Sequence, residues 1–270
     1  RVSRSSWLQN SIMGSIVDLL VMSVVIVWVY MTLWYLYALK FKRNDIADVA
    51  WGLGFAVLAI ACLARADNLQ PKAIITATLV VIWGSRLAIH IALRHEKSPE
   101  DKRYQKMREG WRHPRLQAYL NVFMLQGVFM LLVSAPIFVI MNDTTATLAW
   151  YNWVGICIWA VGFFFESVSD YQLSRFIANK SNKGKVMTIG LWKYSRHPNY
   201  FGEISQWWGI FVIALLSPYW PLAAIGPATI TILILGVSGI PMLEKRYKGN
   251  KEYEKYQKAT SAFFPLPPKP

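Results

Sequence analysis

Long apolar runs separated by short polar stretches dominate the chain. Crossing the hydrocarbon core of a bilayer takes about 20 mostly apolar residues in an α-helix. Runs of this kind occur at residues 16–39, 46–64, 73–93, 118–141, 149–168, 203–217 and 221–240. Only residues 217–221, with two prolines, separate the last two runs, which predicts a tight hairpin. The pattern therefore predicts an all-α integral membrane protein, a seven-transmembrane helix bundle.

Composition agrees with the membrane class. Apolar residues make up 54% of the chain and charged residues only 16%, whereas soluble domains carry about 25% charged residues. No linker, repeat or low-complexity segment divides the sequence. We therefore expect an N-terminal flank, residues 1–15, and one membrane domain, residues 16–270, with long loops at 94–117, 169–202 and 241–270.

The distribution of basic residues predicts the orientation of the bundle. Lys and Arg number three at 40–45, eight at 94–117, six at 169–202 and seven at 241–270. The alternate loops, 65–72, 142–148 and 218–220, hold two, none and none. Basic loops face the cytoplasm, so the N-terminus is expected outside and the C-terminus in the cytoplasm. Topology thus accounts for most of the net charge of +14. It favours membrane lipids over nucleic acid as partners.

Ionisable residues inside predicted spans are costly and mark functional sites by default. The candidates of this kind are all expected in the cytoplasmic half of their spans. This clustering predicts one polar cavity open to the cytosol. Arg86 could instead snorkel to the headgroups, and His90 could be a satisfied interfacial histidine. The residues concerned are Asp48, Arg86, His90, Glu166 and Glu203, with Asp170 just past a span.

Glu166 and Asp170 are harder to explain as structural residues. They are four residues apart, so they share one helical face, where like charges repel. Such a pair tends to need a shared cation, a proton on one member, or hydrogen-bond donors from a ligand.

The stretch GLWKYSRHPNYFGEISQWWG, residues 190–209, combines an expected helix start with polar side chains. Pro198 suits the first helical position, and a helix N-terminus favours bound phosphate. Lys193, Arg196 and His197 would add positive charge there. Asn199 and Glu203 would follow on one face. The stretch predicts a nucleotide cofactor site, with an interfacial lipid anchor as the alternative.

Four segments carry a resemblance to a known family. ESVSDYQLSRF, residues 166–176, and GLWKYSRHPNYFGE, residues 190–203, resemble the steroid 5-alpha-reductase family. They are closer still to its branch of membrane proteins with a DUF1295-type domain. The loop EDKRYQKMREGW and the tail EKRYKGNKEYEKYQKATSAFFPLPPK also fit that branch. The resemblance therefore covers most of the chain after residue 45.

The resemblance implies a seven-span reductase that takes NADPH from the cytosol and transfers hydride to the double bond of an enone in a lipid-soluble substrate. Asp170 matches the acid at the adenosine half of the cofactor, and Asn199 and Glu203 match the pair at its nicotinamide end. Glu166 stands where reductases of known activity have Asn. The further cofactor-binding candidates are Arg103, Tyr171, Arg175, Tyr194, Arg196, His197, Arg246 and Tyr247.

The substrate end departs from the family pattern. Steroid reductases have a Gln-Glu pair in the second span and a Tyr in the third, whereas this chain has Ala47-Asp48 and Trp83. The Trp83 N–H can donate a hydrogen bond but cannot protonate an enolate. Asp48 or His90 could supply the proton. With Glu203, these residues are the catalytic candidates, and no metal site is expected.

Two other functions remain open. The RHPNY motif, a later Glu and the EYxxY tail also resemble isoprenylcysteine and phospholipid methyltransferases, which use S-adenosylmethionine. A non-enzymatic lipid-binding protein would explain the aromatic residues but not the polar ones. Asp170 and the Asn199/Glu203 pair favour the reductase. We expect a multi-pass protein of a bacterial inner membrane rather than of an endoplasmic reticulum. The sequence does not predict the oligomeric state.

Overall fold

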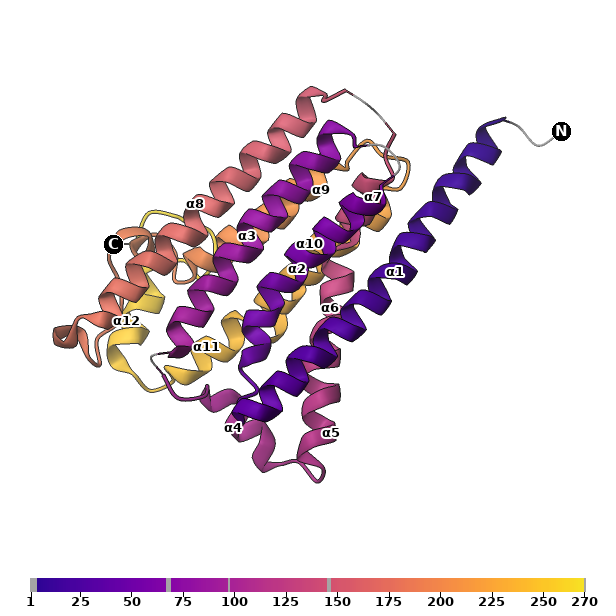
Figure 1. The fold of residues 1–270 in the computed structure, drawn as a ribbon. Coiled ribbons are helices and arrows are strands. Elements are labelled where there is room, and N and C mark those ends of the chain that lie inside the picture. The colour runs from indigo at the N-terminus through magenta and orange to yellow at the C-terminus, as the bar shows by residue number, and fades with distance from the viewer. Residues whose placement is uncertain (1–3, 67–68, 97, 145–146, 270) are drawn as a thin grey trace. The chain divides into compact units, whose positions relative to one another are not determined.

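The computed structural model describes residues 4–66, 69–96, 98–144 and 147–269. Within these ranges the ordered elements are helices, and none is a strand (Figure 1). The all-α prediction is therefore confirmed.

The chain forms two compact units. The first contains Arg1–Leu148 with Leu216–Ile225, and the second contains Ala149–Leu215 with Gly226–Pro270.

In the first unit, α2 and α3 lie side by side (Figure 1). Their backbones meet at two glycines, because a Cβ added to Gly52 would lie 2.6 Å from the carbonyl oxygen of Gly84. Small residues of this kind let membrane helices approach closely. The helices of this unit are α1 (Arg4–Phe41), α2 (Ile46–Arg65), α3 (Pro71–Glu96), α4 (Lys102–Glu109), α5 (Pro114–Ala118), η1 (Tyr119–Met124), α6 (Leu125–Val133) and α7 (Ala135–Met141).

The span expected at residues 118–141 is a chain of short helical pieces. A π-helical turn, η1, precedes α6, and a second break lies at Ser134, just before Pro136. Proline lacks the N–H that would continue the helical ladder, which explains the second break. Single π-turns inside helices are frequent at functional sites.

In the second unit, α8 and α9 pack along each other. A Cβ on Gly202 would lie 2.5 Å from the carbonyl oxygen of Gly162, and one on Gly209 would lie 2.6 Å from that of Gly155. The two backbones are therefore in direct contact at two levels. The helices of this unit are α8 (Trp150–Ala178), η2 (Lys180–Asn182), η3 (Gly190–Lys193), α9 (Pro198–Ile213), the end of α10 (Trp220–Ile232), η4 (Leu233–Val237), α11 (Ile240–Arg246) and α12 (Lys251–Ala259).

Six helical stretches of the described chain are long and apolar enough to cross a membrane. Exposed apolar side chains on α1, such as Val21 and Leu33, fit a lipid-facing surface. The predicted span at 203–217 falls on α9, whose 16 residues measure about 24 Å. The seventh span and the orientation therefore stay predictions. The six stretches are Ser15–Phe41, Ile46–Arg65, Pro71–Glu96, Pro114–Val133, Trp150–Ala178 and Trp220–Arg246.

Candidate functional site

Two carboxyl groups are buried one turn apart near the end of α8. Glu166 is 2% exposed and Asp170 is 7% exposed. The Nε2 of Gln206 on α9 donates to Oε2 of Glu166 at 2.5 Å and to the carbonyl oxygen of Gly202 at 3.3 Å. The contact depends on Gly202, since a Cβ there would lie 2.5 Å from the backbone nitrogen of Glu166. Close glycine packing thus brings the polar faces of α8 and α9 together.

The helix start predicted at Pro198 is confirmed. α9 begins at Pro198, and His197 is its N-cap residue in a non-helical conformation. Asn199 and Glu203 follow in its first two turns and are half-buried. The predicted inner pair therefore stands on a rigid helix, close in sequence to Gly202 and Gln206.

The cationic residues before this helix divide into two groups. Lys193 and Tyr194 are exposed, whereas Arg196 and His197 are buried. Both buried side chains contact the carboxylate of Glu244 on α11. Burial lowers the pKa of His197, and the neighbouring carboxylate offsets only part of that effect. The imidazole is therefore neutral near pH 7.

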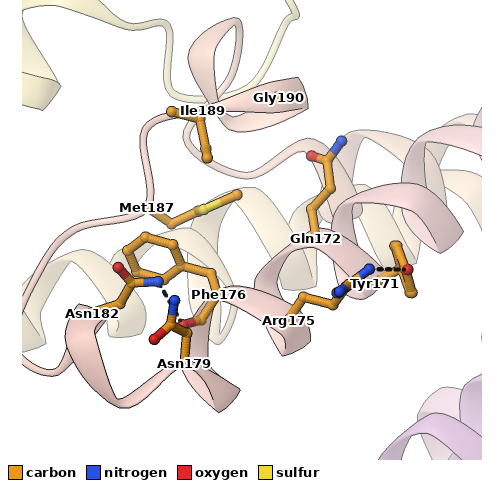
Figure 2. A pocket seen from close by; sticks show the side chains of 9 residues that line it. All are labelled: Tyr171, Gln172, Arg175, Phe176, Asn179, Asn182, Met187, Ile189 and Gly190. Carbon is orange, nitrogen blue, oxygen red and sulfur yellow. Dashed lines mark hydrogen bonds between the residues drawn. The ribbon is translucent and has the colours of Figure 1, made fainter.

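A cavity of about 420 Å³ opens beside the end of α8 (Figure 2). Arg175 donates from Nη1 to the Tyr171 hydroxyl at 2.9 Å. Gly190 adopts a φ of +64°, and a Cβ there would lie 2.5 Å from Oε1 of Gln172. That oxygen accepts from the backbone of Leu191 at 3.0 Å, so loop and helix are fixed together. The lining residues are Tyr171, Gln172, Arg175, Phe176, Asn179, Asn182, Met187, Ile189 and Gly190.

The remaining candidates of the second unit lie in its C-terminal part. Arg246 and Tyr247 are exposed at the end of α11. The ring of Tyr247 stacks on that of Tyr253 at 4.2 Å between centroids. Burial raises the pKa of Tyr253 to about 12, so its hydroxyl stays neutral at physiological pH.

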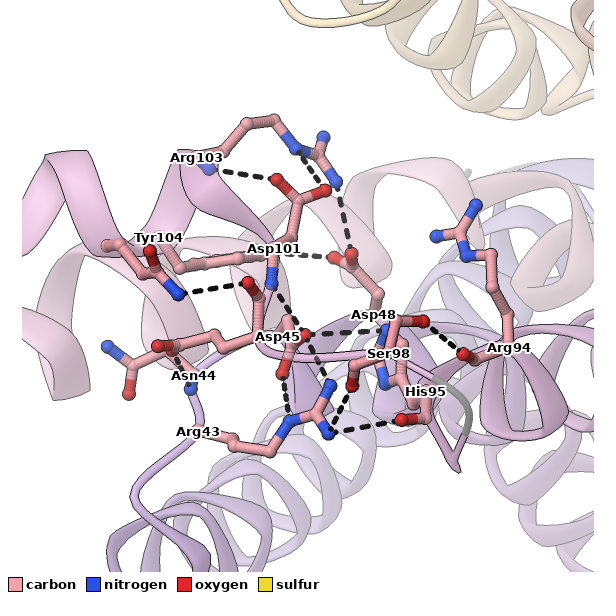
Figure 3. A network of polar contacts seen from close by, with 12 residues as sticks. Arg43, Asn44, Asp45, Asp48, Arg94, His95, Ser98, Asp101, Arg103 and Tyr104 are labelled. Carbon is pink, nitrogen blue, oxygen red and sulfur yellow. Dashed lines mark hydrogen bonds and ion pairs between the residues drawn. The ribbon is translucent and has the colours of Figure 1, made fainter. Parts of the chain in front are cut away.

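The first unit contains a second polar cluster, where α4 meets the ends of α1, α2 and α3 (Figure 3). Asp48 accepts from the Tyr104 hydroxyl at 2.6 Å and from Arg103 at 3.3 Å. Of the predicted residues, Asp48 and Arg103 are thus brought together. Burial and the adjacent Asp48 raise the pKa of Tyr104 well above its usual value.

Asp45 is the most enclosed acid of this cluster. Arg43 donates to both of its oxygens, at 3.0 and 2.9 Å, and the backbone of Asp101 donates at 2.9 Å. Burial raises the pKa of Asp45, but Arg43, the Asp101 amide and His95 outweigh it and hold the pKa below its usual range. These contacts fasten the loop before α4 to the start of α2.

Trp83 and His90 lie on α3 of the same unit. Trp83 is 2% exposed and its ring packs on Phe55 with centroids 5.3 Å apart. His90 is half-buried. Trp83 thus occupies the apolar core of the first unit.

Sequence reasoning missed several residues of both clusters. Tyr104 and Asp45 in the first unit and Gln172 and Glu244 in the second were not candidates. Their partners are mostly tens of residues away in the chain, for example the 48 residues that separate Arg196 from Glu244. The loop 94–117 offered one signal, since it contains both acids and bases.

The fold and the buried polar side chains define a helical, multi-pass membrane protein with polar clusters at helix ends. The chain belongs to the DUF1295 family, which is described as a protein of unknown function and whose model matches residues 15–260. A protein of Schizosaccharomyces pombe, described as uncharacterized, is 22% identical over 171 residues, which cover 54% of this chain and 49% of that protein. The chain thus spans about half the length of this curated relative. No solved structure matches it.

Proposed function

We propose that the protein is an NADPH-dependent membrane reductase. It would transfer hydride to the activated C=C bond of an enone in a lipid-soluble, steroid-like substrate. The hydride chemistry is supplied by the cofactor when bound, and the protein positions it and provides the electrostatics.

The cavity beside α8 is the observation that carries this proposal. The buried acid Asp170 immediately precedes Tyr171, the first lining residue. Residues 171–202 contain six Lys or Arg and no Asp or Glu. A phosphate-bearing nucleotide suits this arrangement, because its phosphates need cations and its ribose hydroxyls can donate to a carboxylate.

Arg175 is the lining residue suited to phosphate. Its guanidinium donates one hydrogen bond to the Tyr171 hydroxyl and lies over the face of the Tyr171 ring. Within the described chain it forms no ion pair with a carboxylate. Its remaining donors can therefore bind a phosphate group in the bidentate manner typical of arginine. The amides of Gln172, Asn179 and Asn182 could hold the polar edge of a base.

The resemblance to steroid 5-alpha-reductases supports the remaining assignments. Asn199 and Glu203 would bind the nicotinamide end, and Asp48 or His90 would supply the proton, with Trp83 as a hydrogen-bond donor. The proposal includes α9 as a seventh span, with the N-terminus outside and the cavity on the cytoplasmic side.

Mass spectrometry of small molecules co-purified in mild detergent, without added nucleotide, tests the proposal. We expect NADP or NADPH at close to one equivalent. S-adenosylmethionine or its homocysteine product would instead identify a methyltransferase. A protein that co-purifies with neither, and that does not bind added NADPH, would be inconsistent with both enzymes.

A further inference from the structure

Arg196 has the sequence context of an anion-binding residue, but its donors are committed within the protein. It is 9% exposed. Its Nε and Nη2 donate to Oε1 of Glu244 at 2.8 and 2.7 Å, and its Nη1 donates to the carbonyl oxygens of Gln257 and Thr260. Each of the three guanidinium nitrogens thus has a partner in the C-terminal segment, residues 240–266.

Glu244 is the centre of this arrangement. Its Oε1 accepts from Arg196 and also lies 3.2 Å from Nε2 of His197. Its Oε2 accepts from Gln257 Nε2 at 3.1 Å. One carboxylate therefore connects the start of α9 with α11 and α12. A buried guanidinium without such a partner would be strongly destabilising.

Backbone hydrogen bonds extend the same junction. The backbone N–H of Arg196 donates to the carbonyl oxygen of Ser261 at 2.9 Å. The backbone N–H of Leu266 donates to the carbonyl oxygen of Tyr194 at 3.0 Å. The hydroxyl of Ser195 donates to the carbonyl oxygen of Phe263 at 2.8 Å. Residues 194–196 are thus each hydrogen-bonded to the C-terminal segment, independently of the Arg196 side chain.

The junction ends where α9 begins. The Ser195 hydroxyl accepts from the His197 N–H at 3.1 Å, and the His197 carbonyl oxygen accepts from Phe201 at 3.1 Å. The first turn of α9 therefore follows directly from residues held by the C-terminal segment. That turn carries Asn199, and the next carries Glu203.

We propose that Arg196 is a positioning residue and does not bind the cofactor. Acting through Glu244, it fixes the C-terminal segment against residues 194–197 and so sets where α9 presents Asn199 and Glu203. The link to cofactor binding rests on the proposed function, whereas the junction itself does not.

Trypsin cleavage of the apo protein in detergent tests the junction without any cofactor. α12 contains Lys251, Lys255 and Lys258, which become cleavable when the segment opens. We expect Arg196→Gln and Glu244→Gln each to accelerate cleavage there about tenfold, with Arg196→Lys in between. Glu254→Gln, the same change at an exposed position of α12, is the control and should leave the rate unchanged. Cleavage of Glu244→Gln at the control rate would overturn the proposal, even if Arg196→Gln does not fold.

A double-mutant cycle on NADPH affinity tests the indirect role. If Arg196 positions the site, the two single variants weaken binding alike, by about tenfold, and the double variant is no weaker than either. If Arg196 binds a phosphate, Arg196→Gln weakens binding while Glu244→Gln leaves it unchanged or tightens it. The second pattern would overturn the positioning role. A wild-type protein that does not bind NADPH would refute the proposed function, and proteolysis would still decide on the junction.

Discussion

The hydroxyl of Tyr104 donates a 2.6 Å hydrogen bond to Oδ1 of Asp48. This contact joins α4 to the first turn of α2 across 56 residues of sequence. Tyr104 is 7% exposed, and the second oxygen of Asp48 accepts from Arg103. The bond thus has a buried donor, and its acceptor is a carboxyl group whose two oxygens both have partners on α4.

Tyr104→Phe is expected to lower the free energy of unfolding by about 1–3 kcal/mol, the usual cost of leaving one partner of a buried hydrogen bond unsatisfied. Thermal unfolding in detergent would measure the loss. Tyr37→Phe is the matched control, because Tyr37 is 48% exposed on α1 of the same unit; we expect a change within about 0.5 kcal/mol. Equal effects of the two variants would mean that the Asp48 contact is not stabilising.

Gly202→Ala should disrupt the packing of α8 on α9. The added methyl would lie 2.5 Å from the backbone nitrogen of Glu166 and from the carbonyl oxygen of Gly162, neither of which can rotate away. Overpacking of this kind costs about 1–3 kcal/mol or more, again measurable by thermal unfolding. Gly236→Ala in η4 is the control, since no atom lies within 4 Å of a Cβ there. If both variants melt alike, the close approach of α8 and α9 does not hold in solution.

The parts of the fold that follow local rules could be predicted from the sequence. Apolar run length predicted the six stretches that are long and apolar enough to cross a membrane, and the geometry of proline predicted the start of α9 at Pro198. The stretch at 203–217 was apolar enough for a span, but a helix beginning at Pro198 ends at Ile213 and has only 16 residues. Apolar character alone therefore did not distinguish α9 from the longer helices.

The polar clusters could be predicted only in part. The i, i+4 spacing placed Glu166 and Asp170 on one face, and both are buried there. The contact between Arg196 and Glu244 could not be predicted, because Arg196 lies in the loop before α9 and Glu244 lies 48 residues further on, in α11. No periodicity or motif specifies such a pair, because it arises from the packing of loops on helices.

Arg175→Gln should weaken NADPH binding by about 1.5–3 kcal/mol, or roughly 10- to 150-fold, if its guanidinium binds a phosphate. NADPH titrations followed by tryptophan fluorescence would provide the affinity. Lys183→Gln removes the same charge from the segment that follows α8, at an exposed position that does not line the cavity. A loss below about twofold is expected there, as is usual for an exposed charge. If the two variants lose NADPH affinity equally, residues 171–202 attract the cofactor only through their overall positive charge.

Asp45 should make the first unit sensitive to acid. Its pKa in the folded protein is held below the usual value, so the unfolded chain takes up a proton first as the pH falls. The stabilisation is therefore complete well above about pH 4, the ordinary pKa of an aspartate, and is lost as the pH falls through the lower, folded pKa. Asp45→Asn should be less stable than wild type by about 1.5–3 kcal/mol near neutral pH, the range for hydrogen bonds to a charged group, and this gap should narrow below about pH 4. Thermal unfolding of the wild type and of Asp45→Asn across this pH range would measure the difference in stability.

Arg43→Gln, which removes the paired guanidinium, should make the stability of the protein less dependent on acid in the same way. A gap that stays constant down to pH values well below 4 would contradict the role of the ion pair.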